Sequence, residues 1–421
     1  MSQRIAIVGG GIAGLTAAWY LGARHQVTVF EAEAQLGGHT YTVDVRREHG
    51  DYAVDMGFIV FNDRTYPNFE SLLTLLGVGR QPTRMGFAVS DARTGLEYCG
   101  DGLSGFFAQR ANLARPRHWR LLRDILRFNR DAPALLTEPG GEQPLGMFLR
   151  EGGYSDAFRR HYILPMGGAI WSCSLAQMEA FPARFFVGFF QHHGLLTLRD
   201  RPQWYVIPGG SRGYVRALRS TCPAHWVTGR AVISVRRDAA GVNLTLAGEE
   251  KPRRFDQVIL ACHSDQVSEI LEDADPLERE CLGVLPYQSN DVVLHTDTRL
   301  LPRRRRAWSS WNAMLGMADE TQPVQVTYNM NLLQGLTSPE TFCVTLNAGD
   351  RIREEKVLHR RTFRHPLFTP AGLAARQRLL QRNGERRTWF CGAWCRNGFH
   401  EDGVVSALNV VDGFERSGGS S

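Results

Sequence analysis

Residues 4–31 read RIAIVGGGIAGLTAAWYLGARHQVTVFE, and the fold class that the sequence predicts follows from this stretch. The run RIAIV is short, apolar and β-branched, which is typical of a strand buried on both faces. The next apolar residues recur at helical spacing, and VTVFE predicts a second buried strand that ends in an acid. With G-x-G-x-x-G at the first turn, the stretch predicts a βαβ unit that binds a dinucleotide.

The three glycines of this motif have separate roles. Gly9 permits the tight turn, Gly11 lets a pyrophosphate approach the backbone, and Gly14 lets helix and strand pack closely. The helix start presents free N–H groups and a positive dipole end to the phosphates. Glu31 stands where a carboxylate accepts hydrogen bonds from a ribose hydroxyl. The alternative is a glycine-rich turn that binds nothing, and the spacing of strand, helix, strand and acid disfavours it.

The composition is that of an ordinary globular protein. The length of 421 residues suggests two or three domains, with 43% hydrophobic and 22% charged residues. The eight cysteines are scattered, and only Cys391 and Cys395 lie close together, in a spacing that is a poor zinc pattern. We expect reduced thiols, no metal site and a cytoplasmic protein. We expect no signal peptide before the first strand, and no run of about 18 apolar residues that could span a membrane is present in the sequence.

The net charge of +6 comes almost wholly from arginine. The densest basic run is Arg303–Arg306, followed by Trp308 and Trp311. It is either a solvated loop or a docking patch for anionic lipid headgroups, with the tryptophans at the interface. The second interpretation predicts membrane surface contact through Arg303–Trp311. No motif for reading nucleic acid accompanies the charge, so we expect no nucleic-acid partner.

The later chain divides into helical and strand-like parts. From residue 103 to about 196, strand alternation gives way to helical patterns, which predicts a mostly helical substrate or cap region. The run Phe185–Phe190 within it is either helix core or the wall of a tunnel or membrane contact. Phe255–Cys262 predicts another buried parallel strand. The chain closes with a strand from Thr388, a glycine-containing loop and a helix starting near Asp402.

An ordered set of motifs resembles the superfamily of FAD-dependent amine oxidases, protoporphyrinogen oxidases and phytoene desaturases, over nearly the whole chain. The set consists of the G-x-G-x-x-G unit, the pair Gly37–Gly38, the string PGG at 208–210, the strand at 258–261 and the closing segment from Gly392 to Gly403.

Five further strings resemble a narrower group. The group is that of bacterial flavoproteins related to the FAD-containing N-terminal part of plant-type cyclopropane fatty acid synthases. It is also similar to a flavin desaturase proposed to act on methyl-branched fatty acyl chains. The strings are VDMGFIVFN from Val54, VVLHTD from Val292, PRRRRAWSSWN from Pro302, YNMN from Tyr328 and GFHEDG from Gly398.

The resemblance implies an α/β fold of two domains, as in amine oxidases. A discontinuous, Rossmann-like FAD-binding domain takes residues 1–82, 200–265 and 385–421. An inserted α+β substrate or cap domain takes residues 83–199 and 266–384.

The resemblance also implies how FAD lies. The first glycines hold the pyrophosphate, Glu31 the adenosine ribose and the backbone of Val232 the adenine, while Gly57 and Phe58 approach the isoalloxazine. Relatives commonly carry arginine where His39 stands, which weakens a charge-assisted contact here. The implied cofactor-binding residues are Gly9, Gly11, Ile12, Ala13, Gly14, Glu31, Ala32, Gly37, Gly38, His39, Thr40, Gly57, Phe58, Val232, Gly392, Trp394, Asp402, Gly403 and Val404.

Candidate catalytic groups lie near the end of the chain. The helix near Asp402 is expected to aim its N–H groups at the flavin N1/C2=O edge, where reduction places negative charge. The candidate proton acceptors are His365 and His400, because an imidazole near its unperturbed pKa suits general-base work at neutral pH. A structural hydrogen bond is the alternative for each. Glu401 either faces the ring or caps this same helix near Asp402.

The positions of the lysines help to judge whether the protein oxidises amines. In many amine oxidases of this superfamily, a water molecule bridges a lysine side chain to flavin N5. Lys251 follows two glutamates in an apparent turn, and Lys356 lies in a segment that reads as an exposed helix. Neither is expected to be a buried site lysine, which argues against ordinary amine oxidation.

We therefore expect an FAD-dependent oxidoreductase that dehydrogenates an apolar substrate, such as an acyl chain of a membrane lipid, by hydride transfer to flavin N5. Oxygen or a quinone would reoxidise the flavin. The alternatives are a flavin amine oxidase and a non-catalytic FAD-bound partner of a lipid methyltransferase. The expected location is the cytoplasm, with peripheral contact at the inner face of the membrane and a functional link to a fatty-acid methyltransferase.

Overall fold

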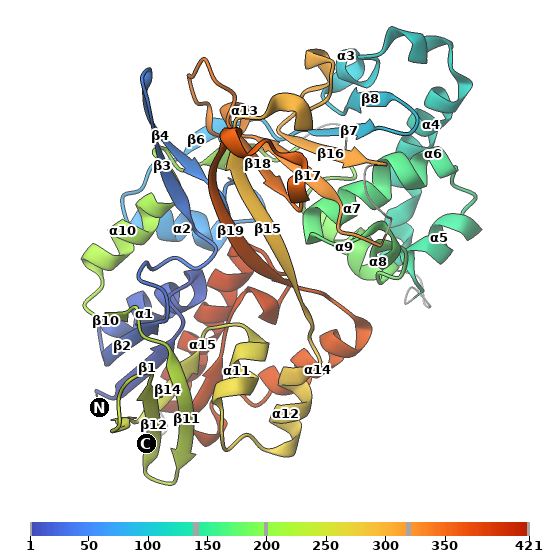
Figure 1. Ribbon diagram of the computed structural model, residues 1–421. Coiled ribbons are helices and arrows are strands. Elements are labelled where there is room, and N and C mark those ends of the chain that lie inside the picture. The colour runs from blue at the N-terminus through green and yellow to red at the C-terminus, as the bar shows by residue number, and fades with distance from the viewer. Residues whose placement is uncertain (1, 138–142, 198–200, 317–320, 419–421) are drawn as a thin grey trace.

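The computed structural model describes residues 2–137, 143–197, 201–316 and 321–418. A parallel sheet with its helices forms one half of the molecule, and a larger mixed sheet with a helical cluster forms the other (Figure 1). The long paired strands β15 (Tyr287–His295) and β19 (Val357–Pro366) run between the halves.

The βαβ unit predicted at residues 4–31 is present as β1, α1 and β2, and β1 lies inside a fully parallel sheet. Ile5, Ala6 and Ile7 are completely buried, as expected for a strand covered on both faces. The strand expected at 255–262 lies beside β1. In order, the sheet contains β10 (His225–Thr228), β2 (Gln26–Glu31), β1 (Arg4–Val8), β14 (Gln257–Leu260) and β20 (Thr388–Phe390).

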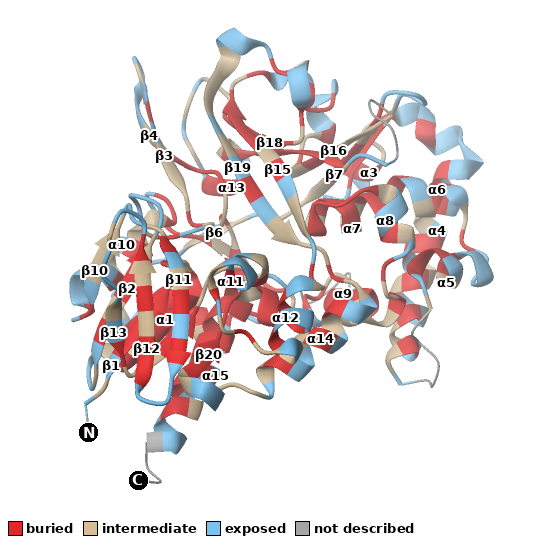
Figure 2. Ribbon diagram, turned by 60° about the horizontal axis from the view of Figure 1, so that its bottom comes forward, coloured by how far each residue is buried: buried red, intermediate tan, exposed pale blue. Residues whose placement is uncertain are grey.

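Two layers cover this sheet (Figure 2). On one face α1 (Ile12–Gly22) packs against the last helix, α15 (His400–Gly418). A Cβ at Gly403 would lie 2.6 Å from Ile12 Cγ2, so this close crossing requires glycine. On the other face an antiparallel sheet shares a core with Ala6 and Val8. Its strands are β11 (Val232–Asp238), β12 (Gly241–Leu246) and β13 (Arg253–Phe255).

Arg237 on β11 makes a buried ion pair that holds this second layer to the helices beyond it. Its two terminal nitrogens donate to the two carboxylate oxygens of Glu278, each at 2.7 Å. The side chains of Arg237 and Glu278 are only 2% and 4% exposed. Arg386 reaches the same carboxylate at 3.3 Å.

Replacing Arg237 with methionine is expected to lower the free energy of unfolding by about 3 kcal/mol, because Glu278 would remain buried and its ion pair would be reduced to the longer contact with Arg386. The matched control Arg254→Met removes the partner of Asp238 in an exposed pair, and should change this free energy by less than about 1 kcal/mol. Denaturant unfolding of both variants measures the difference. An equal decrease in the free energy of unfolding for both variants would contradict the assignment of Arg237 to a stabilising buried ion pair.

The larger sheet has seven strands, antiparallel throughout except for the parallel pair β16–β7. Beyond β19 and β15, the order continues through β18 (Cys343–Leu346), β17 (Gln325–Asn329), β16 (Trp311–Leu315), β7 (Phe87–Asp91) and β8 (Leu96–Cys99).

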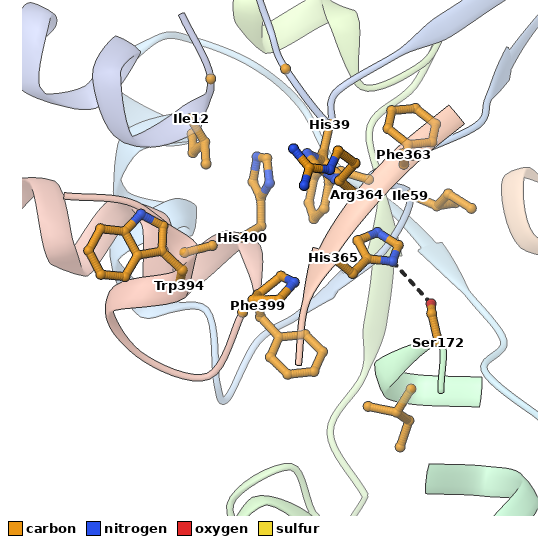
Figure 3. Close-up of a pocket in the computed structure, with 18 of the residues that line it drawn as sticks. Ile12, His39, Ile59, Ser172, Phe363, Arg364, His365, Trp394, Phe399 and His400 are labelled. Atoms are coloured by element: carbon orange, nitrogen blue, oxygen red, sulfur yellow. Dashed lines mark hydrogen bonds between the residues drawn. The ribbon is translucent and has the colours of Figure 1, made fainter. Parts of the chain in front are cut away.

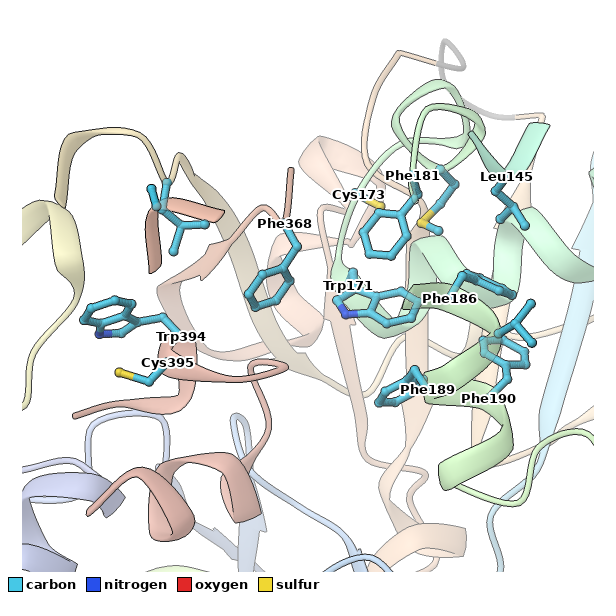
Figure 4. Close-up of a cluster of buried hydrophobic side chains, with 14 of the residues drawn as sticks. Leu145, Trp171, Cys173, Phe181, Phe186, Phe189, Phe190, Phe368, Trp394 and Cys395 are labelled. Carbon is cyan, nitrogen blue, oxygen red and sulfur yellow. The ribbon is translucent and has the colours of Figure 1, made fainter. Parts of the chain in front are cut away.

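Helices dominate residues 103–196, as the loss of alternation predicts. The aromatic run Phe185–Phe190 lies on α9, where Phe186 and Phe190 are buried and stack at 4.2 Å (Figure 4). The run is therefore mainly helix core. The helices are α3 (Gly102–Phe106), α4 (Pro116–Asp131), α5 (Leu145–Glu151), α6 (Asp156–Phe158), α7 (Leu164–Trp171), α8 (Leu175–Glu179) and α9 (Ala183–His192).

The expectation of an exposed helix around Lys356 is wrong. Two short 3-10 turns, Gly349–Arg351 and Glu354–Lys356, occupy this stretch, because the chain enters β19 directly at Val357 and pairs with β15.

Short hairpins and helices complete the fold. Among the described residues, none of the helices combines the length and apolar character that crossing a bilayer requires. The remaining strands are β3 (Thr42–Arg47), β4 (Gly50–Asp55), β5 (Phe61–Asn62), β6 (Gln81–Thr83) and β9 (Trp204–Val206), and the remaining helices are α2 (Pro67–Leu75), α10 (Arg212–Thr221), α11 (Ser264–Ile270), α12 (Pro276–Gly283), α13 (Met330–Gln334) and α14 (Pro370–Leu380).

Candidate active site

A cavity of about 1050 Å³ lies where the carboxyl ends of the parallel strands meet the larger sheet. Gly9, Glu31, Ala261 and Gly392, which end or follow the strands of the parallel sheet, line one side. Residues of β15 to β19 line the other. Ligands of open α/β sheets bind at this edge. Figure 3 shows side chains from α1, β19 and α15 converging on the space.

The glycines of the first turn have distinct surroundings. Gly9 has φ +112°, and a Cβ there would lie 2.8 Å from the backbone of Ala261. A Cβ at Gly14 would lie 1.9 Å from the carbonyl oxygen of Gly9, so the helix could not approach the strand. A Cβ at Gly11 would meet no heavy atom within 4 Å. Gly11 therefore borders an open cradle at the start of α1, of the kind that a pyrophosphate fills.

Glu31 is fixed at the rim of this cradle. Its carboxylate accepts hydrogen bonds from the backbone N–H groups of Gly10 at 2.7 Å and Glu33 at 2.9 Å. The side chain remains half-exposed and lines the cavity beside Val232. Because each carboxylate oxygen has further acceptor capacity, Glu31 can still accept from a ribose hydroxyl. The cradle and this acid together fit the adenosine and pyrophosphate parts of FAD.

Most of the residues singled out from the sequence meet at this one cavity. Those in its lining are Gly9, Gly11, Ile12, Ala13, Glu31, Ala32, Gly37, Gly38, His39, Gly57, Phe58, Val232, Gly392, Trp394, His365 and His400.

Five others lie behind the lining. Besides Gly14 and Gly403, whose lack of a side chain allows helix packing, these are Thr40, Asp402 and Val404. Thr40 shares a 2.6 Å hydrogen bond with the Tyr214 hydroxyl, Asp402 accepts from the backbone N–H of Phe399 at 2.9 Å, and Val404 belongs to the core. These five residues support the wall rather than form it.

The end of α15 faces the cavity. Its first intrahelical bond runs from Gly403 N–H to Phe399 O, so the N–H groups of His400, Glu401 and Asp402 have no partner inside the helix. Phe399 and His400 line the cavity, which places the positive end of the helix dipole there. Glu401 caps a different helix, α2, by accepting from the backbone N–H groups of Asn68 and Phe69.

Three imidazoles cluster in the lining. The ring of His39 lies 5.2 Å from that of His365 and 5.7 Å from that of His263. Burial lowers the pKa of His39 to about 4 and those of His263 and His365 to about 3. In the described part of the chain, His39 Nε2 and His263 Nδ1 have no hydrogen-bond partner. These two nitrogens beside the cradle fit a ligand with its own polar groups.

His365 and His400 are both held neutral, which weakens them as general bases. Asn290 Nδ2 lies 3.1 Å from His365 Nδ1, and Ser172 Oγ lies 3.1 Å from the same nitrogen (Figure 3). His400 stacks on Phe58 at 3.6 Å, and burial lowers its pKa well below its usual value. An imidazole whose pKa is so depressed takes up protons poorly at neutral pH. The observed contacts match the structural alternative for each histidine.

The far end of the cavity is apolar. Neither lysine lines it: Lys251 is exposed, and Lys356 is half-buried at the turn before β19. The wall consists largely of aromatic and aliphatic side chains, among them Phe87, Tyr98, Tyr162, Met166, Ile170, Phe189, Leu195, Trp311 and Tyr328.

Sequence reasoning missed the contribution of β19 beyond His365. Arg361, Phe363 and His365 recur at every second position and line the cavity together with Arg364. Their period-two spacing is the signal that could have identified this wall strand. The arginines at 360, 361 and 364 hid it, because they make the segment read as an exposed surface.

Comparisons with known proteins agree with this geometry. A family model described as "Flavin containing amine oxidoreductase" matches residues 12–341. No curated protein matches the sequence significantly.

Similar solved structures share the fold over the full chain. One is assigned as a protoporphyrinogen oxidase of Exiguobacterium sp. 255-15, with 18% identity, 99% of each chain covered and a TM-score of 0.71. A CLA-producing fatty acid isomerase from P. acnes has 17% identity, 98% coverage of each chain and a TM-score of 0.69. A putrescine oxidase has 15% identity, 99% coverage of each chain and a TM-score of 0.70.

Proposed function

Because the chain belongs to the family of flavin-containing amine oxidoreductases and is an FAD-dependent oxidoreductase, we propose that it dehydrogenates an apolar substrate, specifically an acyl chain of a membrane lipid. When bound, FAD supplies the hydride acceptor at N5. The protein residues then have to bind the chain, orient one C–H bond and exclude water.

The observation that carries the proposal is the apolar wall at the far end of the cavity. Met166, Ile170 and Leu195 offer aliphatic contact to a chain of CH₂ groups, and each group buried there contributes about 0.8 kcal/mol to binding. The neutral imidazole of His365 adds no charge to this wall. Since neither His365 nor His400 is a strong base, the proton lost in the dehydrogenation passes to water at the cavity mouth, outside the apolar wall that holds the chain.

The same wall disfavours an amine as substrate. A substrate ammonium needs a buried carboxylate or a comparable counter-charge. Within the described lining, the carboxylates are those of Glu31, Glu33, Asp101 and Glu269, which are exposed or half-exposed. An aromatic cage facing N5 would be the remaining way to hold an amine.

The test is anaerobic mixing of the FAD-loaded protein with detergent-dispersed acyl lipids and, separately, with amines. Acyl lipids are expected to bleach the visible flavin band, and amines are not. Bleaching by amines alone would replace the proposal with amine oxidation. A flavin that no substrate reduces would support the alternative of a non-catalytic partner of a lipid methyltransferase.

A variant of the wall makes this test specific. Ile170→Glu places a carboxylate among apolar side chains, and should slow bleaching by acyl lipid by on the order of 100-fold while FAD remains bound. Leu332→Glu introduces the same charge at an exposed site outside the lining, and should leave the rate unchanged. Stopped-flow absorbance measures both. Equal rates for the two variants would place the substrate elsewhere.

We further propose that the protein works in the cytoplasm, at the inner face of the membrane, with a functional link to a fatty-acid methyltransferase. All eight cysteines are free thiols, which supports a reducing compartment. The electron acceptor proposed is oxygen or a quinone.

A further inference from the structure

An exposed surface at the edge of the helical half carries a high density of arginine. We call it the basic face and define it as residues 102–123 and Arg303–Arg306. Residues 102–123 contain five arginines and no acidic residue. All nine arginines of the basic face are exposed. α3 and α4 lie far from the parallel sheet in Figure 1, so the basic face lies away from the adenosine end of the cavity.

Specific contacts join the two segments into one surface. The buried carboxylate of Glu97, on β8, accepts hydrogen bonds from the backbone N–H groups of Arg303 at 2.8 Å and Arg304 at 3.2 Å. The backbone N–H of Glu97 donates to Gln109 Oε1 at 3.2 Å. His118 Nε2 lies 2.8 Å from Phe106 O, which fixes the start of α4 against α3.

Apolar side chains stand among these arginines. Leu103 is 69% exposed, Leu113 53% and Trp119 48%. Leu113 and Trp119 border a surface hollow with Arg120 and Arg123. The tryptophans expected at this interface are placed differently: Trp308 is half-buried and donates its indole N–H to Pro302 O, and Trp311 lines the cavity.

We propose that the basic face binds the surface of a lipid bilayer that contains anionic headgroups. Arginines attract the headgroups, and each such residue near the surface changes the partition roughly fivefold. Leu103, Leu113 and Trp119 enter the boundary between headgroups and acyl chains. Nucleic acid would match the charge but leaves these three apolar side chains without a partner.

The basic face adjoins the cavity. Asp101 lines the cavity and directly precedes α3, and its carboxylate accepts from Ser309 Oγ at 2.8 Å. A bilayer on the basic face would therefore touch the wall through which an acyl chain could enter. The entry of an acyl chain from the bilayer rests on the proposed function, whereas the binding of the basic face to the bilayer does not.

The test is sedimentation of the full-length, FAD-loaded protein with vesicles of phosphatidylcholine, with and without phosphatidylglycerol. Binding is expected only with phosphatidylglycerol. The variant R117S/R120S/R305S/R306S should weaken that binding by on the order of 100-fold or more. The control R216S/R219S/R236S/R279S removes the same charge from exposed sites outside the basic face and should bind like the wild type.

A second variant separates charge from apolar insertion. L103S/L113S keeps every arginine and should weaken vesicle binding by roughly tenfold. Equal vesicle binding by the two arginine variants would overturn the proposal. It would also be overturned if the wild type bound a DNA duplex but no vesicles, and if the variant R117S/R120S/R305S/R306S lost the binding of DNA. Bleaching by detergent-dispersed lipid should be unchanged in all three variants, so failure of docking and failure of the proposed chemistry are distinguishable.

Discussion

Replacing Gly11 with valine is expected to give a folded protein that has lost its FAD. The backbone of Gly11 has φ −77° and ψ −177°, an extended conformation that valine adopts readily. A Cβ there would meet no heavy atom within 4 Å, so a side chain would project into the cradle at the start of α1. We expect the dissociation constant for FAD to rise by on the order of 1,000-fold, or ~4 kcal/mol. Fluorescence titration of the apoprotein measures it.

The matched control is Gly79→Val. A Cβ at Gly79 would also meet no heavy atom within 4 Å, and this glycine lies outside the cavity lining. Both variants should unfold at the same denaturant concentration as the wild-type apoprotein, and only Gly11→Val should fail to bind FAD. Wild-type affinity in Gly11→Val would mean that the pyrophosphate lies elsewhere.

Acid is expected to destabilise the protein between pH 6.5 and pH 4, because buried histidines bind protons only when the chain unfolds. Burial lowers the pKa values of His193 and His295 to about 4, from 6.5 in the unfolded chain. The folded state therefore binds fewer protons than the unfolded state below pH 6.5. Stability that is present above this pH is lost as the pH falls toward 4, by about 3 kcal/mol for each histidine.

Asp55 acts in the opposite direction over part of this range. Burial raises its pKa to about 6 from 3.8, although Thr42 and Ser211 donate hydrogen bonds to the carboxylate. Its protonation favours the folded state as the pH falls from 6 to 4, by up to about 3 kcal/mol. The three groups together predict a net loss of about 3 kcal/mol between pH 6.5 and pH 4.

His295→Gln isolates one contribution. Thr345 Oγ1 lies 2.6 Å from His295 Nε2, and the backbone N–H of Asp297 donates to Nδ1. Both nitrogens of the neutral ring therefore have a hydrogen-bond partner. The variant should flatten the dependence of unfolding free energy on pH by about 3 kcal/mol over this interval. His49→Gln, at an exposed site, should leave the profile unchanged. If the unfolding free energy of His295→Gln depended on pH as that of the wild type does, the assignment of this pH dependence to His295 would be refuted.

Local patterns predicted the nucleotide-binding edge well. β1, α1, β2 and Glu31 lie within residues 4–31, and the contacts that place them are short in sequence. The parallel strand β14 was also recognisable, because its residues are apolar and buried on both faces. Propensity and spacing suffice for such units.

The other side of the cavity could not be predicted in the same way. β15 and β19 pair over about seventy residues of separation, and this register decides that His365 and Phe363 face the cavity. Trp311 looked like part of a surface patch, but β16 pairs in parallel with β7 and carries it into the wall. The lowered pKa of His400 follows from its burial and from the neighbouring His39. None of these partners is near in sequence.

The most direct test of the central claim is the mass of the acyl chain after one anaerobic turnover with stoichiometric FAD-loaded protein. We predict that the chain loses two hydrogen atoms while the flavin band bleaches. A chain of unchanged mass with a displaced double bond, or bleaching that only amines produce, would contradict the account.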